Sequence, residues 1–183
     1  EPAVNGIQAI LSPNTGIVDY VKVAHAYADD VRAAGGEIVT GCKVIEIVRR
    51  GSMTTLITST GSLEARAAIA CAGLYSDRLA NTTNTVRIIP FRGSYYTLRP
   101  DRRSLVNSLI YPVPDPRFPF LGVHFSPTIN GEVWVGPNAV LAFAREGYRR
   151  SDINVADVFN TLSYPGFWKL PATYWRMGAL EIF

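Results

Sequence analysis

A single histidine lies inside an apolar, strand-like stretch in the second half of the chain. His124 follows Leu121, Gly122 and Val123 and precedes Phe125. A titratable imidazole in such a run needs a hydrogen-bond partner, because an unpaired buried polar group costs stability. A neutral imidazole can also take up a proton near pH 7, which makes His124 the best candidate for a general base. The alternative is a core histidine that a backbone carbonyl satisfies.

Alternation along this strand favours the chemical interpretation. Successive side chains of a strand point to opposite faces, so His124 shares its face with Gly122 and Ser126, whereas Val123 and Phe125 lie on the other face. The small neighbours leave space beside the imidazole. The pattern therefore predicts that His124 lies in the wall of a pocket.

An arginine on another predicted strand supplies a second candidate group. Arg92 lies between Phe91 and Gly93, and its planar guanidinium matches the two oxygens of a carboxylate. Tyr95 and Tyr96 are candidates beside it, but they point to opposite faces, so only one can join the site. Tyr95 is the better candidate if Gly93, which shares its face, opens the pocket. A purely structural tyrosine is the alternative.

A third polar candidate is an asparagine in a turn-like sequence. Asn138 follows Gly136 and Pro137. Its amide could orient a bound substrate, although Gly-Pro-Asn is also ordinary turn composition. The three candidate groups, His124, Arg92 and Asn138, are together suited to an organic anion.

Composition narrows the class of protein. The chain has 183 residues, enough for one well-buried domain or for a large part of a bigger one. Hydrophobic residues make up 48% and charged residues 18%, which is ordinary for a soluble α/β or α+β protein. The net charge is +3, and the basic pairs Arg49-Arg50, Arg102-Arg103 and Arg149-Arg150 are scattered. We therefore expect a solvated surface and no nucleic-acid partner.

Cysteine spacing and hydropathy suggest a location. Cys42 and Cys71 lack the short spacing of a metal or redox pair. Buried free thiols in a reducing cytosol fit them best, and a disulfide is the alternative. No segment approaches the roughly 18 consecutive apolar residues of a membrane helix, and the first residues lack the pattern of a signal peptide. We expect a cytoplasmic chain without a metal site, in which the sequon Asn81–Thr83 is accidental.

The first half of the chain predicts a helix followed by a β-meander. A short strand is expected around Ile7–Leu11, and Asp19 is a plausible N-cap for a helix that ends near Ala34, before two glycines. His25 lies on the polar side of this helix, opposite an apolar stripe, so a surface position is expected. Three antiparallel strands then follow at residues 38–48, 53–59 and 66–71, the last of them buried.

The second half predicts a larger sheet and then a helical region. Strands are expected near residues 90–96, 109–113, 122–126 and 132–135, with a hairpin at Asn130-Gly131. Prolines between these strands stiffen a loop that cannot pair as a central strand: Pro112, Pro114, Pro116 and Pro119. After Asp152 the pattern becomes helical and aromatic. It stops in mid-pattern at Phe183, so we expect the chain to belong to something longer.

Four separated motifs carry a resemblance to a known family: Ser12–Tyr20 (SPNTGIVDY), Cys71–Asp77 (CAGLYSD), Pro90–Tyr96 (PFRGSYY) and the run Leu109–Phe143. Together they resemble the L-2-hydroxyglutarate oxidase/dehydrogenase family, which belongs to the FAD-dependent oxidoreductases of the D-amino-acid oxidase type. The family's glycine-rich G-x-G-x-x-G fingerprint does not occur in this sequence. The chain is therefore similar to the middle of such an enzyme.

The resemblance implies a fold and a cofactor. It implies an α+β chain in which residues 1–85 form the second portion of an FAD-binding α/β domain. Residues 86–183 would form a large antiparallel or mixed β-sheet substrate domain with a helical C-terminal part. Residues expected to border the FAD are Thr15, Gly16, Val44, Cys71, Ala72 and Gly73. A glycine at the turn lets the backbone approach a phosphate closely. Simple sheet packing is the alternative for Val44 and Cys71.

The resemblance also implies a reaction, the oxidation of L-2-hydroxyglutarate to 2-oxoglutarate with hydride transfer to the flavin. In it His124 would be the base, and the isolated chain is expected to be inactive. The alternatives are a related FAD-dependent amine or glycerol-3-phosphate oxidoreductase, or a non-catalytic domain that binds organic anions. The expected partner is a small hydroxy acid. A peripheral link to electron acceptors at the inner face of the membrane is an open alternative. The oligomeric state is not implied.

Overall fold

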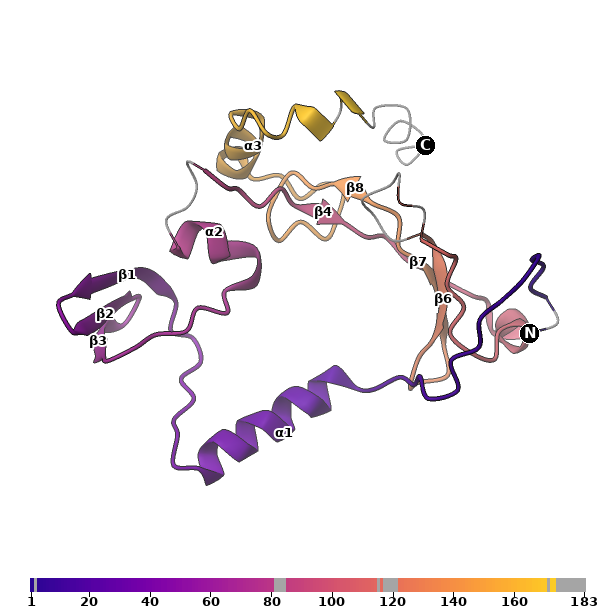
Figure 1. The fold of residues 1–183 in the computed structure, drawn as a ribbon, viewed down its shortest axis with the longest axis horizontal. Coiled ribbons are helices and arrows are strands. Elements are labelled where there is room, and N and C mark those ends of the chain that lie inside the picture. Colours follow the sequence, from indigo (N-terminus) through magenta and orange to yellow (C-terminus); the bar gives the residue numbers. More distant parts are fainter. Residues whose placement is uncertain (2, 81–84, 115, 117–121, 171, 174–183) are drawn as a thin grey trace. The chain divides into compact units, whose positions relative to one another are not determined.

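The computed structural model describes residues 1, 3–80, 85–114, 116, 122–170 and 172–173, and it separates into two compact units. The first unit contains Glu1–Ala34 and Phe91–Val140, and the second contains Gly35–Pro90 and Leu141–Gly178. Figure 1 gives the order of the elements along the chain. In this grouping the first 34 residues fall in one unit with residues 91–140, and the division expected after residue 85 stays a prediction. The assignment of one part to cofactor and the other to substrate stays a prediction.

The helix of the first unit begins where its capping residue predicts. Helix α1 spans Tyr20–Ala33, and the Asp19 carboxylate accepts hydrogen bonds from the backbone N–H groups of Val21 and Lys22 at 3.0 and 3.3 Å. Gly35 follows with a φ of 80°, a left-handed conformation that ends the helix. His25 is exposed, as expected.

The predicted apolar stripe of α1 is present in the sequence but is not covered. No residue of α1 is buried, and the side chains of Tyr20 and Tyr27 are 78% and 69% exposed. The strand expected around Ile7–Leu11 is wrong, because this segment has no strand partner and its apolar side chains are solvent-exposed. A lone extended segment cannot satisfy its backbone groups within a ladder.

The rest of the first unit contains the 3₁₀-helix η2 (Pro100–Leu105) and short antiparallel strands, the last of which, β8 (Val140–Leu141), continues into Leu141 of the second unit. Strand β6 (His124–Pro127) and strand β7 (Val133–Gly136) pair as the expected hairpin, with Gly131 at a φ of 76° in the turn. Strand β5 (Tyr96–Thr97) pairs with the other edge of β7, which gives the order β5-β7-β6. Strands β4 (Phe91–Arg92) and β8 form a second, two-stranded sheet.

The segment 109–113 was expected to be a strand and contributes only one bridge. Ile110 and Phe125 exchange backbone hydrogen bonds of 3.0 and 2.9 Å. Pro112 lacks an N–H group and so prevents the ladder from continuing. In the proline-rich loop, residues 115 and 117–121, which include Pro119 and Leu121, lie outside the described residues.

The second unit begins with the predicted meander in a shifted register. Strands β1 (Val44–Arg50), β2 (Met53–Thr58) and β3 (Gly61–Ala65) pair antiparallel in that order. The first strand starts six residues later than residue 38 because Gly41, at a φ of 69°, turns the chain before it.

The third strand also differs from the expected residues 66–71. A tight turn pairs Gly61 with Thr58, so β3 reaches the start of β2 when Ala65 pairs with Thr54. No further residues of β2 remain to pair with residues 67–71. That segment is extended but unpaired, and Ile69 is 92% exposed, so the expected buried strand is wrong.

Short helices complete the second unit. The turn of 3₁₀-helix η1 (Gly73–Tyr75) leads directly into α2 (Ser76–Leu79). Helix α3 (Val155–Leu162) follows Asp152 as the helical pattern predicts, and the Asn154 side chain caps it. The sequon at residues 81–83 and the chain from Tyr174 to Phe183 lie outside the described residues.

The described residues bury few apolar side chains. The buried ones are Val106, Val133, Ala142 and Phe167. This fits the expected large part of a bigger domain better than it fits one well-buried domain. Within the described residues, no helix combines the length and the apolar character needed to cross a lipid bilayer.

Candidate functional site

The imidazole of His124 lies in a cluster of aromatic rings in the first unit. His124 begins β6, pairs with Gly136 of β7 and is 6% exposed. The ring of Tyr111 stacks on the imidazole, with centroids 4.3 Å apart and an interplanar angle of 18°. The ring of Tyr95 meets it edge-on at 6.4 Å. The imidazole is thus held from two sides.

A backbone carbonyl selects the tautomer of His124. The Nδ1 atom lies 3.0 Å from the carbonyl oxygen of Gly122. Because a carbonyl oxygen can only accept, Nδ1 carries the hydrogen of the neutral ring and Nε2 keeps its lone pair. This carbonyl contact satisfies the alternative interpretation, a core histidine, and it engages Nδ1 rather than Nε2.

The space expected beside two glycines is filled by prolines. A Cβ atom on Gly122 would lie 2.7 Å from the Cγ of Pro112, and one on Gly93 would lie 2.6 Å from the Cβ of Pro137. Both glycines therefore permit close packing rather than opening a cavity. The argument that small neighbours leave room beside His124, and that Gly93 makes room beside Tyr95, does not hold at these two positions.

The guanidinium of Arg92 is available for an anion. Arg92 ends β4 and is half-buried. Among the described residues, it has no hydrogen bond or ion pair. A half-buried arginine without an acidic partner is suited to bind a carboxylate.

The two tyrosines differ in their surroundings. Tyr95 contacts His124 and also packs on Trp134 with ring centroids 5.6 Å apart. Tyr96 is 77% exposed, and no ring contact joins it to another described residue. Of the pair, the structure brings Tyr95 to the imidazole.

Asn138 links two segments of backbone. Its side-chain oxygen accepts a hydrogen bond of 2.8 Å from the N–H group of Ser94, and its own N–H group donates to the carbonyl oxygen of Ser94 at 3.4 Å. These contacts hold the chain that follows Arg92. They give Asn138 a structural role, which leaves its amide nitrogen as the group that could reach a ligand.

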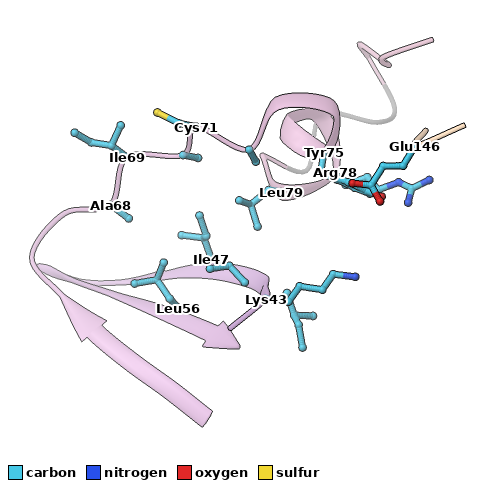
Figure 2. A pocket seen from close by; sticks show the side chains of 14 residues that line it. Lys43, Ile47, Leu56, Ala68, Ile69, Cys71, Tyr75, Arg78, Leu79 and Glu146 are labelled. Atoms are coloured by element: carbon cyan, nitrogen blue, oxygen red, sulfur yellow. The ribbon is translucent and has the colours of Figure 1, made fainter. Parts of the chain in front are cut away.

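A cavity of about 850 Å³ lies in the second unit, where several predicted cofactor residues meet. Figure 2 shows apolar side chains such as Ile47, Leu56 and Ala68 at one end, and Tyr75 and Arg78 at the other. Val44, Cys71 and Ala72 are among its lining residues. A volume of this size is within the range of small-molecule and cofactor sites.

The turn beside this cavity has an open backbone. Gly73 adopts a φ of 52°, and a Cβ atom placed on it would meet nothing within 4 Å. The conformation therefore favours glycine, and Gly73 is exposed next to Ala72, which lines the cavity. Lys43 also lines the cavity and has no acidic partner among the described residues. A cavity that has a lysine in its wall and a glycine turn next to one of its lining residues is suited to a phosphate-containing group.

Two of the predicted cofactor residues lie elsewhere in the chain. Thr15 and Gly16 belong to the first unit, in the turn before α1. The hydroxyls of Thr15 and Ser12 are hydrogen-bonded at 2.6 Å, and both residues are exposed. They do not line the cavity that Val44, Cys71 and Ala72 share.

A buried ion pair, Arg145 with Asp77, is in contact with the turn Gly73–Tyr75. The Arg145 guanidinium donates to both carboxylate oxygens of Asp77, and these side chains are only 4% and 2% exposed. Arg145 also donates to the carbonyl oxygen of Leu74, inside the turn. Burial raises the pKa of Asp77, but hydrogen bonds from Arg145 and the N–H group of Ile88 outweigh it, so the pKa is lowered overall. The same contact raises the pKa of Arg145.

A second carboxylate extends this network. Asp157 of α3 accepts a hydrogen bond of 2.9 Å from the N–H group of Arg145 and one of 2.5 Å from the Arg78 side chain. Burial acts to raise the pKa of Asp157, yet these two hydrogen bonds lower it overall. Beside the network, burial and the negative charge of Glu146 raise the pKa of Tyr75. Tyr75 is therefore a neutral phenol at pH 7.

Sequence reasoning missed several residues of these two sites. Tyr111 could have been suspected from its place beside Pro112 in the stretch that contains His124. Arg145 carries no such local signal, because its partner Asp77 lies 68 residues away. The expectation for the cysteines was partly wrong: both are free, but Cys71 is exposed and Cys42 is half-buried. Hydrogen bonds from Thr58 and Thr60 lower the pKa of the Cys42 thiol.

Comparisons with known proteins identify relatives of the whole chain. Residues 1–163 match a family model described as "FAD dependent oxidoreductase". The chain is 49% identical to an L-2-hydroxyglutarate dehydrogenase of Indibacter alkaliphilus over 187 residues, which covers 100% of this chain and 47% of that protein. It is 46% identical to the mitochondrial L-2-hydroxyglutarate dehydrogenase of Nematostella vectensis and 44% identical to the human one.

The chain is shorter than these relatives. It is covered completely by the Nematostella and human proteins but spans only 44% and 43% of their lengths. Among solved structures, glycine oxidase from Geobacillus kaustophilus aligns with a TM-score of 0.45 and 18% identity. That alignment covers 79% of this chain and 36% of the other.

Proposed function

Because the chain belongs to the FAD dependent oxidoreductase family, we propose that it forms part of an FAD-dependent enzyme that oxidises L-2-hydroxyglutarate to 2-oxoglutarate. The observation that carries this proposal is the identity of 42–49% to proteins named L-2-hydroxyglutarate dehydrogenase. The chain spans less than half the length of those relatives, so the activity belongs to the longer protein.

The cavity of the second unit is the proposed contact with FAD. The cation of Lys43 in its wall and the glycine turn that follows Ala72 suit the phosphates of a dinucleotide. Val44, Cys71 and Ala72 would border the same group. Thr15 and Gly16 remain proposed contacts on the strength of the resemblance. From the resemblance we also propose that the β-rich section from Val86 to Val135 forms a sheet over the flavin in the longer protein.

The aromatic cluster around His124 is the proposed catalytic centre. Oxidation of a 2-hydroxy acid removes a proton from the hydroxyl group and a hydride from the carbon that bears it. Bound FAD would supply the acceptor for the hydride. The Nε2 atom of His124 takes the hydroxyl proton, since Nδ1 is committed to the carbonyl of Gly122. Stacking on Tyr111 holds the ring plane while this proton moves.

Arg92 and its neighbours have proposed roles in substrate binding. The guanidinium of Arg92 would pair with one carboxylate of the substrate through two parallel hydrogen bonds. Tyr95, at the edge of the imidazole, is the proposed neighbour of the hydroxy acid. Tyr96 and Asn138 are the weaker candidates, because one is exposed and the other already holds the backbone of Ser94. Cytoplasmic location and electron transfer to a membrane acceptor also belong to this proposal.

Substitution of His124 in the full-length protein tests the proposed base. His124→Gln retains a polar side chain but cannot act as a base, so we expect kcat with L-2-hydroxyglutarate to fall about 10²–10⁴-fold. Flavin content should change little, because the proposed FAD contacts lie on other residues. The thermal unfolding midpoint of the variant is measured alongside, since His124 is buried and stacked on Tyr111. His25→Gln, on the exposed face of α1, is the matched control and should retain full turnover. Near-normal kcat in the His124 variant would remove this residue from the mechanism.

The substrate and cofactor are tested separately on the unmodified full-length protein. Its flavin absorbance and fluorescence reveal bound FAD. A panel of L-2-hydroxyglutarate, amines and glycerol 3-phosphate then distinguishes the proposed reaction from the related oxidations. A protein that lacks flavin but still binds organic anions would instead be a binding domain.

A further inference from the structure

We propose that Arg145 is a positioning residue for the turn Gly73–Tyr75 (η1), which is part of the proposed FAD contact. Arg145 holds this turn in place through the carbonyl group of Leu74 and the carboxylate of Asp77. The inference rests on the proposed FAD contact at this turn and adds a residue that does not itself line the cavity. Arg145 lies between β8 and α3, far along the chain from the turn that it contacts.

The contacts of Arg145 join segments that are distant in the sequence. One guanidinium nitrogen donates to the Leu74 carbonyl oxygen and to Asp77, and the other donates to the second oxygen of Asp77 at 2.6 Å. The backbone N–H group of Arg145 donates to Asp157 of α3. The turn, the segment after β8 and the start of α3 are therefore connected through one side chain and its backbone.

The carboxylate oxygens of Asp77 are fully engaged in hydrogen bonds. In addition to Arg145, its oxygens accept hydrogen bonds from the N–H groups of Arg78 and Ile88, at 2.9 and 3.0 Å. A carboxylate offers about four acceptor positions, and these contacts use them. The buried pair of Arg145 and Asp77 therefore serves to fix geometry rather than to transfer protons.

The hydrogen-bond network of Arg145, Asp77 and Asp157 does not line the cavity itself but contacts or adjoins residues that do. Tyr75, the last residue of the turn, and Arg78 of α2 line the cavity, as does Glu146, the residue after Arg145 (Figure 2). The Arg145 guanidinium lies over the Tyr75 ring at 5.9 Å, and Arg78 is tied to Asp157. A shift of Arg145 would thus move both the open backbone at Gly73 and the polar end of the cavity.

Only arginine has the shape for these contacts. Its planar fork presents two nitrogens to one carboxylate while a third N–H group remains for the Leu74 carbonyl. A lysine retains the charge but offers one nitrogen, which cannot reach all three acceptors in the same geometry. Arg145→Lys should therefore keep the charge balance and loosen the turn.

The experiment compares FAD affinity with stability in the full-length protein. For Arg145→Lys we expect FAD to bind about tenfold more weakly or worse, in line with the loss of a charged hydrogen bond. The double variant Asp77→Asn/Arg145→Met removes both charges. Its thermal unfolding midpoint should recover relative to Arg145→Met, because no unpaired buried charge remains. Its FAD affinity should not recover, since the Leu74 carbonyl still lacks its donor.

Matched variants at an exposed ion pair provide the control. Arg99 pairs with Asp101 at 3.1 Å and its side chain is 81% exposed, so Arg99→Lys and Asp101→Asn/Arg99→Met should leave both FAD affinity and the unfolding midpoint unchanged. The inference is overturned if Arg145→Lys binds FAD like the wild type. It is also overturned if the affinity of the double variant recovers together with its stability. If the wild-type protein itself fails to bind FAD, the proposed function fails instead.

Discussion

At the residue scale, His124 shows how a packing contact and a chemical one can coincide. The Gly122 carbonyl that satisfies the imidazole also assigns the hydrogen to Nδ1, which leaves Nε2 as the acceptor. Stacking on Tyr111 adds a fixed ring plane. The contact of Nδ1 with this carbonyl is what makes Nε2 the nitrogen of the proposed base.

Arg92 provides a prediction at the same scale. Arg92→Lys in the full-length protein retains the charge and loses the planar fork, so we expect KM for L-2-hydroxyglutarate to rise about tenfold with a smaller change in kcat. Steady-state kinetics measure both parameters. Arg102→Lys, an exposed arginine of the helix Pro100–Leu105, is the control and should leave KM unchanged. An unchanged KM in the Arg92 variant would contradict carboxylate binding by this residue.

At the element scale, the sheets of the first unit depend on close backbone approach. Gly93 lies against Pro137, and Asn138 holds the next residue, Ser94, through its side chain. These contacts connect the end of β4 to the start of β8. They place Arg92 on a segment that packing fixes, rather than on a free loop.

Gly93→Ala tests this packing. The added Cβ would lie 2.6 Å from the Cβ of Pro137, so we expect overpacking to destabilise the fold by about 1–3 kcal/mol. Urea unfolding of the full-length protein measures the change. The control is Gly6→Ala, where the nearest atom is a backbone oxygen at an ordinary 3.8 Å. Equal stability of the two variants would mean that Pro137 does not pack on Gly93 as described.

At the scale of the whole molecule, the buried charges of the second unit predict a dependence of stability on pH. Asp77 and Asp157 both have a lowered pKa in the folded state, mainly because hydrogen bonds outweigh burial. An unfolded aspartate titrates at about 3.9, so the unfolded chain binds more protons at acidic pH. The stability that these groups contribute is present above about pH 5 and is lost as the pH falls below about 4.

Thermal unfolding between pH 3 and pH 7 checks this prediction. Asp77→Asn should lower stability at pH 7 by about 3 kcal/mol or more, because it leaves Arg145 without its carboxylate. The gap between variant and wild type should narrow as the pH falls below about 4, because this aspartate then takes up a proton in the unfolded wild-type chain and the folded state loses its advantage. Asp29→Asn, at an exposed ion pair of α1, should show neither effect. A gap that stays constant with pH would contradict the lowered pKa of Asp77.

The amino-acid sequence by itself determined the features that depend on nearby residues. The Asp19 cap acts on the N–H groups of the next turn, and Asn130-Gly131 turns the β6–β7 hairpin within a few residues. The four motifs were likewise enough to identify the family, because they are read directly from the chain. The start of β1 and the end of β3 were mispredicted, since they depend on the φ of Gly41 and on the length of β2.

Only the tertiary structure decided what surrounds each functional side chain. Tyr111 and Pro112 come to His124 and Gly122 through a single bridge between Ile110 and Phe125. Arg145 meets Asp77 across 68 residues of sequence. A hydrophobic or polar pattern states which face a residue occupies, whereas its contacts depend on how separate segments pack together. Residue type therefore indicated the chemistry, and packing determined which nitrogen, which turn and which partner are available for it.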